Sequence, residues 1–255
     1  MPTGWDHPDT ARYYEAFCEA HARYRDANWT LAAAAALSPG LRVLDLAAGT
    51  GRTAAAALAR GCDVACLEPA SAMRETGRRG VPQAVWLSEW PAPGAAFDRV
   101  LCGSAIWQMT PLAGTLARVA QLVKPGGCFA FNVPSLYLGE ADEPGGGSDP
   151  NLVVLAARLA DGRRPSAAAG DAPPGVDEFE RLMREAGFSP ARWCARQRLT
   201  QAALRDWMKI PVLTDALFDG MAADDRAALV DAAYAQCDAS SWRWEAWTGW
   251  TAWKI

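Results

Sequence analysis

Residues 41–54 read LRVLDLAAGTGRTA and carry the strongest structural signal in the chain. A short apolar run reaches Asp45, then Gly49 and Gly51 follow, and an alanine-rich helical segment begins near Thr53. Glycine permits a sharp turn because it lacks a Cβ atom. The helix then opens with N–H groups that have no intrahelical partner and can face a ligand. The stretch therefore predicts a cofactor site built largely from main-chain atoms.

Composition limits the classes of protein to consider. The 255-residue chain is 51% hydrophobic and carries a net charge of −4, as expected for one large globular domain, with or without a cap. The acidic balance argues against nucleic acid, and no apolar run reaches the length that spans a bilayer. Seven scattered cysteines without paired CxxC spacing indicate reduced thiols rather than zinc. With no signal-peptide pattern at the N-terminus, we expect a cytoplasmic, metal-free protein that binds a small molecule.

Strand-like and helical segments alternate through the first half of the chain. Strands are predicted at residues 42–46, 63–67, 84–87, 99–102 and 128–132, and helices at 53–60, 70–78 and 112–122. This alternation predicts a parallel sheet covered on both faces, with ligands beyond the carboxyl ends of the strands. Ahead of the sheet, residues 9–37 are predicted to be helical, with Asp9 as the first N-cap.

The second half of the chain breaks this pattern. Residues 139–175 predict a loop flanking a short helix at 151–159, followed by a helix at 176–186, a strand at 191–199, helices over 200–237 and a final strand at 241–255. The final strand carries five tryptophans: Trp242, Trp244 and Trp250 on one face, and Trp247 and Trp253 on the other. We expect a strand buried on both faces rather than a binding platform.

The glycine turn alone leaves two cofactor classes open. Gly49 to Ala54 satisfies the G-x-G-x-x-A pattern of dinucleotide sites, whereas the Gly-Lys-Ser/Thr of a Walker loop does not follow. Asp45 would be an ill-placed negative charge beside a pyrophosphate but could accept hydrogen bonds from an ammonium group. Glu68, which ends the second strand, could bind both ribose hydroxyls of either cofactor.

Four segments together resemble the class I S-adenosylmethionine-dependent methyltransferases. They are VLDLAAGTGRTA (43–54), CLEPASAM (66–73), FDRVLCGSAIWQM (97–109) and LVKPGGCFAF (122–131), with Ala47 where many relatives have the first glycine. The resemblance implies an α/β fold: a Rossmann-like seven-stranded mixed sheet, helices on both faces, an antiparallel last strand and a helical cap. It further implies an N-terminal helical cap over 1–37 and a methyltransferase domain over 38–255, with cap insertions at about 134–175 and 200–240.

The resemblance also implies a methyl-donor site, carried over residue by residue. The methionine end would be held by Asp45, Ala47, Gly49 and Gly51, the ribose by Glu68, the adenine by Pro69, Ala70, Met73, Ser88, Glu89 and Trp90, and the sulfonium side by Cys102, Gly103 and Ser104. The cofactor would be S-adenosyl-L-methionine, with S-adenosyl-L-homocysteine as its product.

Aromatic residues dominate the candidate acceptor site. Trp107 and Gln108 occupy the position where many small-molecule members face their substrate, and Tyr137 and Trp207 could add to the wall. Aromatic walls suit flat, partly apolar acceptors. We therefore expect methyl transfer to a small aromatic or apolar metabolite, of the kind made in secondary metabolism, by a monomer or homodimer. The chemistry of the methylated atom stays open.

The sequence does not single out one catalytic side chain. Methyl transfer is an in-line displacement that gains most from alignment, and a general base is needed only when the acceptor loses a proton. The candidates are His7, His21, Tyr13 and Tyr14, all in the N-terminal segment. Because none stands out as a base, use of the cofactor without methyl transfer, as in a cyclase or a regulatory binder, stays open. An NAD-dependent oxidoreductase is less favoured because no Tyr-Lys spacing is found.

Overall fold

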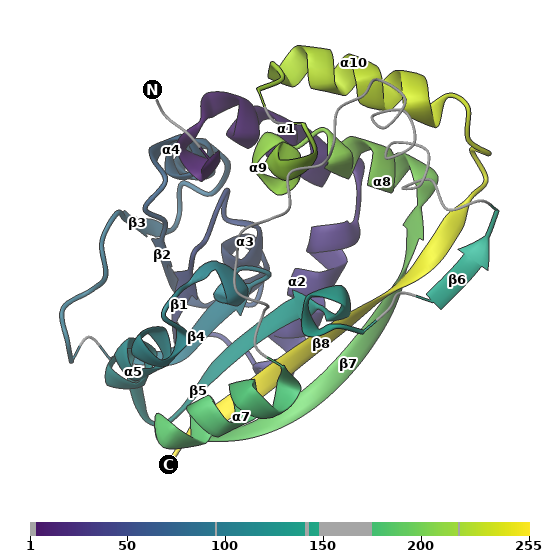
Figure 1. Cartoon of the computed structure of the whole chain (residues 1–255). Coiled ribbons are helices and arrows are strands. Elements are labelled where there is room, and N and C mark those ends of the chain that lie inside the picture. Colours follow the sequence, from purple (N-terminus) through teal and green to yellow (C-terminus); the bar gives the residue numbers. More distant parts are fainter. Residues whose placement is uncertain (1–3, 95, 141–142, 148–174, 219) are drawn as a thin grey trace. The chain divides into compact units, whose positions relative to one another are not determined.

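The computed structural model describes residues 4–94, 96–140, 143–147, 175–218 and 220–255 (Figure 1). The chain forms two compact units. The sheet unit comprises Tyr24–Ala141, Pro173–Ala195 and Ala246–Ile255, and the helical unit comprises Met1–Arg23, Asp142–Ala172 and Arg196–Glu245. The short helix predicted at 151–159 lies outside the described residues.

Within the described residues, eight strands form one mixed sheet in the order β3-β2-β1-β4-β5-β8-β6, with β7 paired to β8. Strands β1 to β5 are parallel, whereas β8 is antiparallel to β5 and β6. In Figure 1 the yellow arrow of β8 runs between those of β5 and β7. The strands are β1 (Arg42–Leu46), β2 (Asp63–Leu67), β3 (Val85–Leu87), β4 (Phe97–Gly103), β5 (Val123–Pro134), β6 (Glu143–Gly146), β7 (Phe188–Thr200) and β8 (Trp242–Lys254).

This topology confirms the predicted Rossmann-like α/β fold and adds one strand to it. The additional strand is β6, in a segment where the sequence predicts a loop. Its four residues, Glu-Pro-Gly-Gly, have low strand propensity, and pairing with β8 supplies the conformation that local preference does not.

One face of the sheet is covered by α5 (Leu112–Leu122) and α7 (Val176–Glu185). Leu116 of α5 and Phe179 of α7 are fully buried in the same apolar cluster as Leu44 of β1. Successive side chains of a strand point to opposite faces, so a central parallel strand is apolar on both. The packing of these side chains fixes the position of β1 and therefore of the turn that follows it.

The opposite face is covered by α2 (Arg23–Ala34) and α3 (Arg52–Leu58). Val43 packs there with Leu31 of α2 and Ala54 of α3. The helices predicted for both faces of the sheet are thus confirmed.

A third helix, α4 (Ser71–Gly80), follows β2. A Cβ atom on Gly77 of α4 would lie 2.1 Å from the Trp86 ring, so this helix can approach β3 only with glycine at that position. Trp86 donates its indole N–H to the carbonyl of Val81, 3.2 Å away. The contact fixes α4, and with it the turn that follows β2.

The middle of the tryptophan-rich strand β8 is buried on both faces, as the sequence predicts, whereas its two ends are partly exposed. Trp247 and Trp250 are buried, whereas Trp244 and Trp253 each keep 39% of their surface exposed. Trp250 stacks on Phe131 at 5.0 Å between ring centroids. At the two ends of the strand, Trp244 pairs with Glu143 of β6 and Trp253 with Cys128 of β5, and the Trp253 ring lies under the guanidinium of Arg99.

The helical unit contains α1 (Pro8–Ala20), α8 (Gln201–Met208), α9 (Pro211–Thr214) and α10 (Ala223–Tyr234). The helical prediction for 200–237 is therefore confirmed, with breaks between the helices. The N-cap of α1 is His7 rather than Asp9, because the His7 ring accepts the Asp9 N–H at 3.1 Å. A proline at the first helical position has no N–H to satisfy, which places the cap one residue before it.

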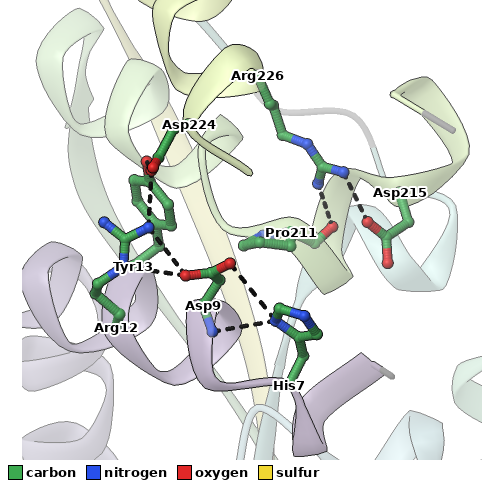
Figure 2. Close-up of polar contacts among 8 residues, drawn as sticks. All are labelled: His7, Asp9, Arg12, Tyr13, Pro211, Asp215, Asp224 and Arg226. Atoms are coloured by element: carbon green, nitrogen blue, oxygen red, sulfur yellow. Dashed lines mark hydrogen bonds and ion pairs between the residues drawn. The ribbon is translucent and has the colours of Figure 1, made fainter. Parts of the chain in front are cut away.

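Two polar clusters join the helices of this unit (Figure 2). The buried Arg226 of α10 donates to the Pro211 carbonyl at 2.7 Å and to the Asp215 carboxylate at 2.9 Å. At the other cluster, Asp224 accepts from Arg12 at 2.8 Å and from Tyr13 at 2.9 Å. Together these contacts connect α10 to α9 and to α1.

Candidate functional site

The turn between β1 and α3 has the backbone geometry that its glycines predict. Ala47, Gly49 and Gly51 all have left-handed backbones, with φ of 54°, 57° and 85°. Gly51 is additionally restricted by packing, because a Cβ atom there would lie 2.9 Å from Val81 and 3.1 Å from Trp86. The turn thus presents main chain rather than side chains at the carboxyl end of β1.

Asp45 is buried at the start of this turn, with 1% of its surface exposed. One carboxylate oxygen, Oδ2, accepts the N–H of Ala54 at 2.8 Å. The other, Oδ1, is buried and has no hydrogen-bond partner among the described residues. Burial raises the pKa of this carboxyl to about 8. An unpaired buried carboxylate oxygen is costly, and a cationic ligand group would relieve that cost.

Glu68 directly follows β2 and lies beside the same turn. Its Oε2 accepts the N–H of Gly49 and its Oε1 the N–H of Ala70, each at 2.8 Å. Burial raises the pKa of this carboxyl, whereas the two N–H groups and Arg74 lower it. Each carboxylate oxygen has a second lone pair, so the group can still accept from a ligand's hydroxyls. Asp45 and Glu68, predicted from separate strands, therefore lie on either side of one turn.

The residues predicted beside the adenine differ in their burial and in the elements that they contact. Met73 is buried, and its methyl group would lie 3.5 Å from a Cβ atom on Gly49. Ser88 and Glu89 are exposed. Trp90 packs against the α5 side of the sheet, with the Arg118 guanidinium 4.5 Å from its ring. The structure thus brings Met73 to the glycine turn but directs the Trp90 ring toward α5.

The end of β4 offers main chain more than side chains. Cys102 is fully buried in the core, and burial raises the pKa of its thiol. Gly103 has no room for a side chain, because a Cβ atom would lie 2.5 Å from the Thr53 hydroxyl and 2.6 Å from the Asn28 amide oxygen. The sequence reasoning missed Asn28, whose only signal is an amide within an apolar helical face.

Ser104 has a left-handed backbone, with φ of 56°. Its N–H donates to the main-chain oxygen of Asn132 at 3.1 Å and to the Asn132 side chain at 3.0 Å. Asn132 also donates to the Ala27 carbonyl at 3.1 Å, so a buried amide joins β5 to α2 and to the loop after β4. Asn132 is a second residue that the sequence reasoning missed, although a lone amide within an apolar strand is a signal for a buried polar contact.

Two aromatic residues predicted for the acceptor side lie together. Trp107 and Tyr137, in the loops after β4 and β5, stack with ring centroids 4.4 Å apart and an interplanar angle of 17°. The indole N–H of Trp107 is buried without a hydrogen-bond partner in the described part of the chain. Gln108 lies one residue further along, and its main-chain N–H donates to Ala105.

Comparison with known proteins agrees with this geometry. A family model described as a methyltransferase domain matches residues 18–209. The chain belongs to the class I S-adenosylmethionine-dependent methyltransferases. The matched span includes every donor-site residue named above.

Two curated methyltransferases match the chain over part of their length. An uncharacterized methyltransferase of Mycobacterium tuberculosis is 36% identical over 39% of this chain and 40% of its own. A demethylmenaquinone methyltransferase of Beutenbergia cavernae is 30% identical over 47% of this chain and 52% of its own. The chain therefore matches about half the length of these relatives, or less.

Solved structures share the fold at lower identity. The phosphoethanolamine N-methyltransferase 2 of Haemonchus contortus, solved with S-adenosylhomocysteine, has a TM-score of 0.52 and 15% identity, covering 90% of this chain and 52% of its own. The 4+2 cyclase SpnF has a TM-score of 0.54 and 18% identity, covering 90% of this chain and 81% of its own. At this identity the likeness extends to the fold alone.

The remaining residues predicted for the site lie in the helical unit, where each contacts other residues of that unit. The His7 ring caps α1, and the Tyr13 hydroxyl donates to Asp224 (Figure 2). His21 lies 2.8 Å from the Asp206 carboxylate, which Arg205 and Lys209 also contact. Tyr14 packs edge-on against Trp5, and the Arg23 guanidinium covers the Trp207 ring at 5.1 Å. The catalytic roles of the first four and the acceptor-binding role of Trp207 stay predictions.

No metal centre is indicated by the described side chains, which contain no group of three or more histidine, cysteine, aspartate or glutamate residues placed to hold an ion. Among the same residues, no helix is long and apolar enough to cross a membrane.

Proposed function

We propose that this protein transfers a methyl group from S-adenosyl-L-methionine to a small aromatic or apolar metabolite. The observation that carries the proposal is the unpaired, buried Oδ1 of Asp45 beside three left-handed residues. A pyrophosphate would bring negative charge to that oxygen, whereas a cationic cofactor would bring the positive charge it lacks. The donor set therefore fits the methyl donor better than a dinucleotide.

When bound, S-adenosyl-L-methionine supplies an electrophilic methyl group on a positively charged sulfur. Asp45 and the main chain of Ala47, Gly49 and Gly51 would hold its methionine end, and Glu68 would accept from its ribose hydroxyls. These residues bind and orient, and the rigid turn limits the motion of whatever they hold. Alignment of this kind can supply a large part of the acceleration of a displacement reaction.

The acceptor side of the proposal is supported by the stacked pair Trp107 and Tyr137. Their rings form a flat apolar surface beyond the ends of β4 and β5, which suits an aromatic or quinone-like molecule. One relative is a demethylmenaquinone methyltransferase, so acceptors with fused rings are the first to test. A base from the N-terminal segment would be required only for acceptors that lose a proton.

Two experiments test cofactor binding and methyl transfer separately. S-adenosylhomocysteine should raise the melting temperature of the protein by several degrees, and NAD should not. Stabilisation by NAD alone would refute the methyl-donor proposal. Methyl transfer is then measured with donor labelled in the methyl group, against naphthoquinols, phenols and amines, with Glu68→Ala as the binding-impaired control.

A second candidate function is use of the same cofactor without methyl transfer. It is favoured because candidate bases of the N-terminal segment are engaged in structural contacts: the His7 ring caps α1 and the Tyr13 hydroxyl donates to Asp224. Binding of S-adenosylhomocysteine without labelled product across the whole acceptor panel would support this candidate over methyl transfer.

A further inference from the structure

Arg74 lies one turn into α4 and reaches back to the end of β2. Its Nη1 donates to the carbonyl of Glu68 at 2.7 Å and to the carbonyl of Pro69 at 2.8 Å. Its own main-chain N–H donates to the carbonyl of Ala70 at 2.9 Å. Three consecutive carbonyls of the turn after β2 are therefore held by one residue.

The same turn is held from its other side by the Glu68 carboxylate. That carboxylate accepts from Gly49 in the first turn and from Ala70 in the second. Glu68 is thus an internal link between the two turns of the donor site, in addition to its proposed contact with ribose. Any motion of the Glu68 main chain would move both hydrogen bonds.

Arg74 also brings positive charge near this carboxylate. The other titratable groups coupled to Glu68 are Asp45 on β1, Cys66 on β2 and Cys102 on β4, and none of them carries positive charge. Arg74 is the cation that the described residues bring near Glu68, and it adds to the larger effects of the Ala70 and Gly49 N–H groups, which oppose the rise of the Glu68 pKa on burial. A buried carboxylate without a compensating charge tends to take up a proton.

We propose that Arg74 is a positioning residue of the methyl-donor site: it fixes the turn that carries Glu68, and thereby the two N–H contacts from Gly49 and Ala70 that stabilise the Glu68 carboxylate. The proposal rests on the proposed function for the role of Glu68 toward ribose. The arrangement of Arg74, the two turns and Glu68 is a property of the protein itself. Arg74 acts through Glu68 and is not a catalytic residue.

The test compares Arg74→Met with Arg74→Lys and with a control, Arg78→Met, on the same helix. Arg78 is exposed and lies one turn further along. The affinity for S-adenosylhomocysteine is measured by calorimetry at pH 6, 7 and 8, and each variant is expressed relative to the unmodified protein at the same pH. Circular dichroism and thermal unfolding check that each variant is folded.

Arg74→Met should weaken binding about tenfold at pH 8, and by at least threefold more at pH 6, because Glu68 with loosened N–H contacts and without a nearby cation is more readily protonated. Arg74→Lys should keep the pH profile of the unmodified protein while binding remains weaker, since the lysine side chain is shorter and lacks the planar geometry of the guanidinium. Arg78→Met should match the unmodified protein. Unchanged binding in Arg74→Met, or a loss that is the same at every pH, would overturn the proposal.

Hydrogen exchange gives a second measurement that needs no ligand. In the free protein, Arg74→Met should speed exchange of the Gly49 and Ala70 amides, which donate to Glu68, and Arg78→Met should not. Unchanged exchange at both amides would refute the positioning role. Faster exchange in a protein that binds no S-adenosylhomocysteine would instead uphold the role of Arg74 on Glu68 and reject the methyl-donor proposal.

Discussion

Asp45 should make the stability of the free protein fall as pH rises through neutrality. Its carboxyl is buried, has one unpaired oxygen, and has a pKa of about 8 against an ordinary value of 3.8. Between those two values the folded state holds a proton that the unfolded chain has released. Stability is therefore greatest at low pH for this group and is lost as pH rises, the reverse of the usual behaviour of a paired aspartate.

The size of the effect follows from proton linkage. A difference of one bound proton changes the free energy of unfolding by about 1.4 kcal/mol for each pH unit. From pH 5.5 to 7.5 the contribution of Asp45 should thus fall by about 2–3 kcal/mol, a large part of the roughly 5–15 kcal/mol that a domain has. Asp45→Asn keeps the size and the hydrogen bond from Ala54 but cannot ionise.

The assay is urea unfolding at pH 5.5, 6.5, 7.5 and 8.5 of the unmodified protein, Asp45→Asn and a control, Asp63→Asn. Asp63 is an exposed acid on the neighbouring strand. Other titrations are common to all three proteins and cancel in the differences. We expect the unmodified protein to lose stability relative to Asp45→Asn as pH rises, and Asp63→Asn to follow the unmodified protein. Parallel curves for the unmodified protein and Asp45→Asn would refute the reasoning.

Three further substitutions test other parts of the structure. Glu68→Ala should weaken S-adenosylhomocysteine binding by about one to two orders of magnitude in calorimetry, because ribose hydroxyls lose a charged partner, and unchanged affinity would remove that role. Gly51→Ala should lower the free energy of unfolding in urea by about 2 kcal/mol or more, since its φ is +85° and Val81 is too close. Gly80→Ala, where a Cβ atom would meet nothing, should lower it little. Arg226→Met should destabilise the protein by about 2 kcal/mol in the same assay, because buried hydrogen bonds of a charged group are lost, and a change below about 0.5 kcal/mol would count against that role.

The fold was largely predictable because its signals are local. The glycines after β1 and the acid that follows β2 lie within a few residues of the elements they define, and the alternation of apolar segments extends over the whole parallel sheet. Strand β6 was not predictable in this way, since its sequence favours a turn and only pairing with β8 makes it a strand. The five tryptophans of β8 mark a strand, but which of them are buried depends on the side chains that distant segments, such as Phe131 and Phe179 around Trp250, pack against them.

Part of the candidate site also has local signals in the sequence. Asp45 and Glu68 are recognisable because a charged residue that ends an apolar strand is unusual. Arg74 and Asn28 are hard to recognise from the sequence, because each acts through a contact with a distant segment or through main-chain carbonyls. Asn132 carries a signal, a lone amide within an apolar strand, but its partners lie far away in the chain. Trp90 was suggested by the resemblance, and its ring lies near the Arg118 guanidinium of α5, so its contact with adenine stays a prediction.

Ala47 has a consequence for the thermodynamics of ligand binding. It is the one residue of the three left-handed positions in the turn after β1 that has a side chain, and that conformation is mildly unfavourable for alanine. Alanine also has fewer conformations than glycine in an unfolded or loosened turn. The conformational entropy at this position is therefore lost on folding and not on ligand binding. A turn with glycine at position 47 would fold with less strain but would bind its ligand with a larger entropic penalty.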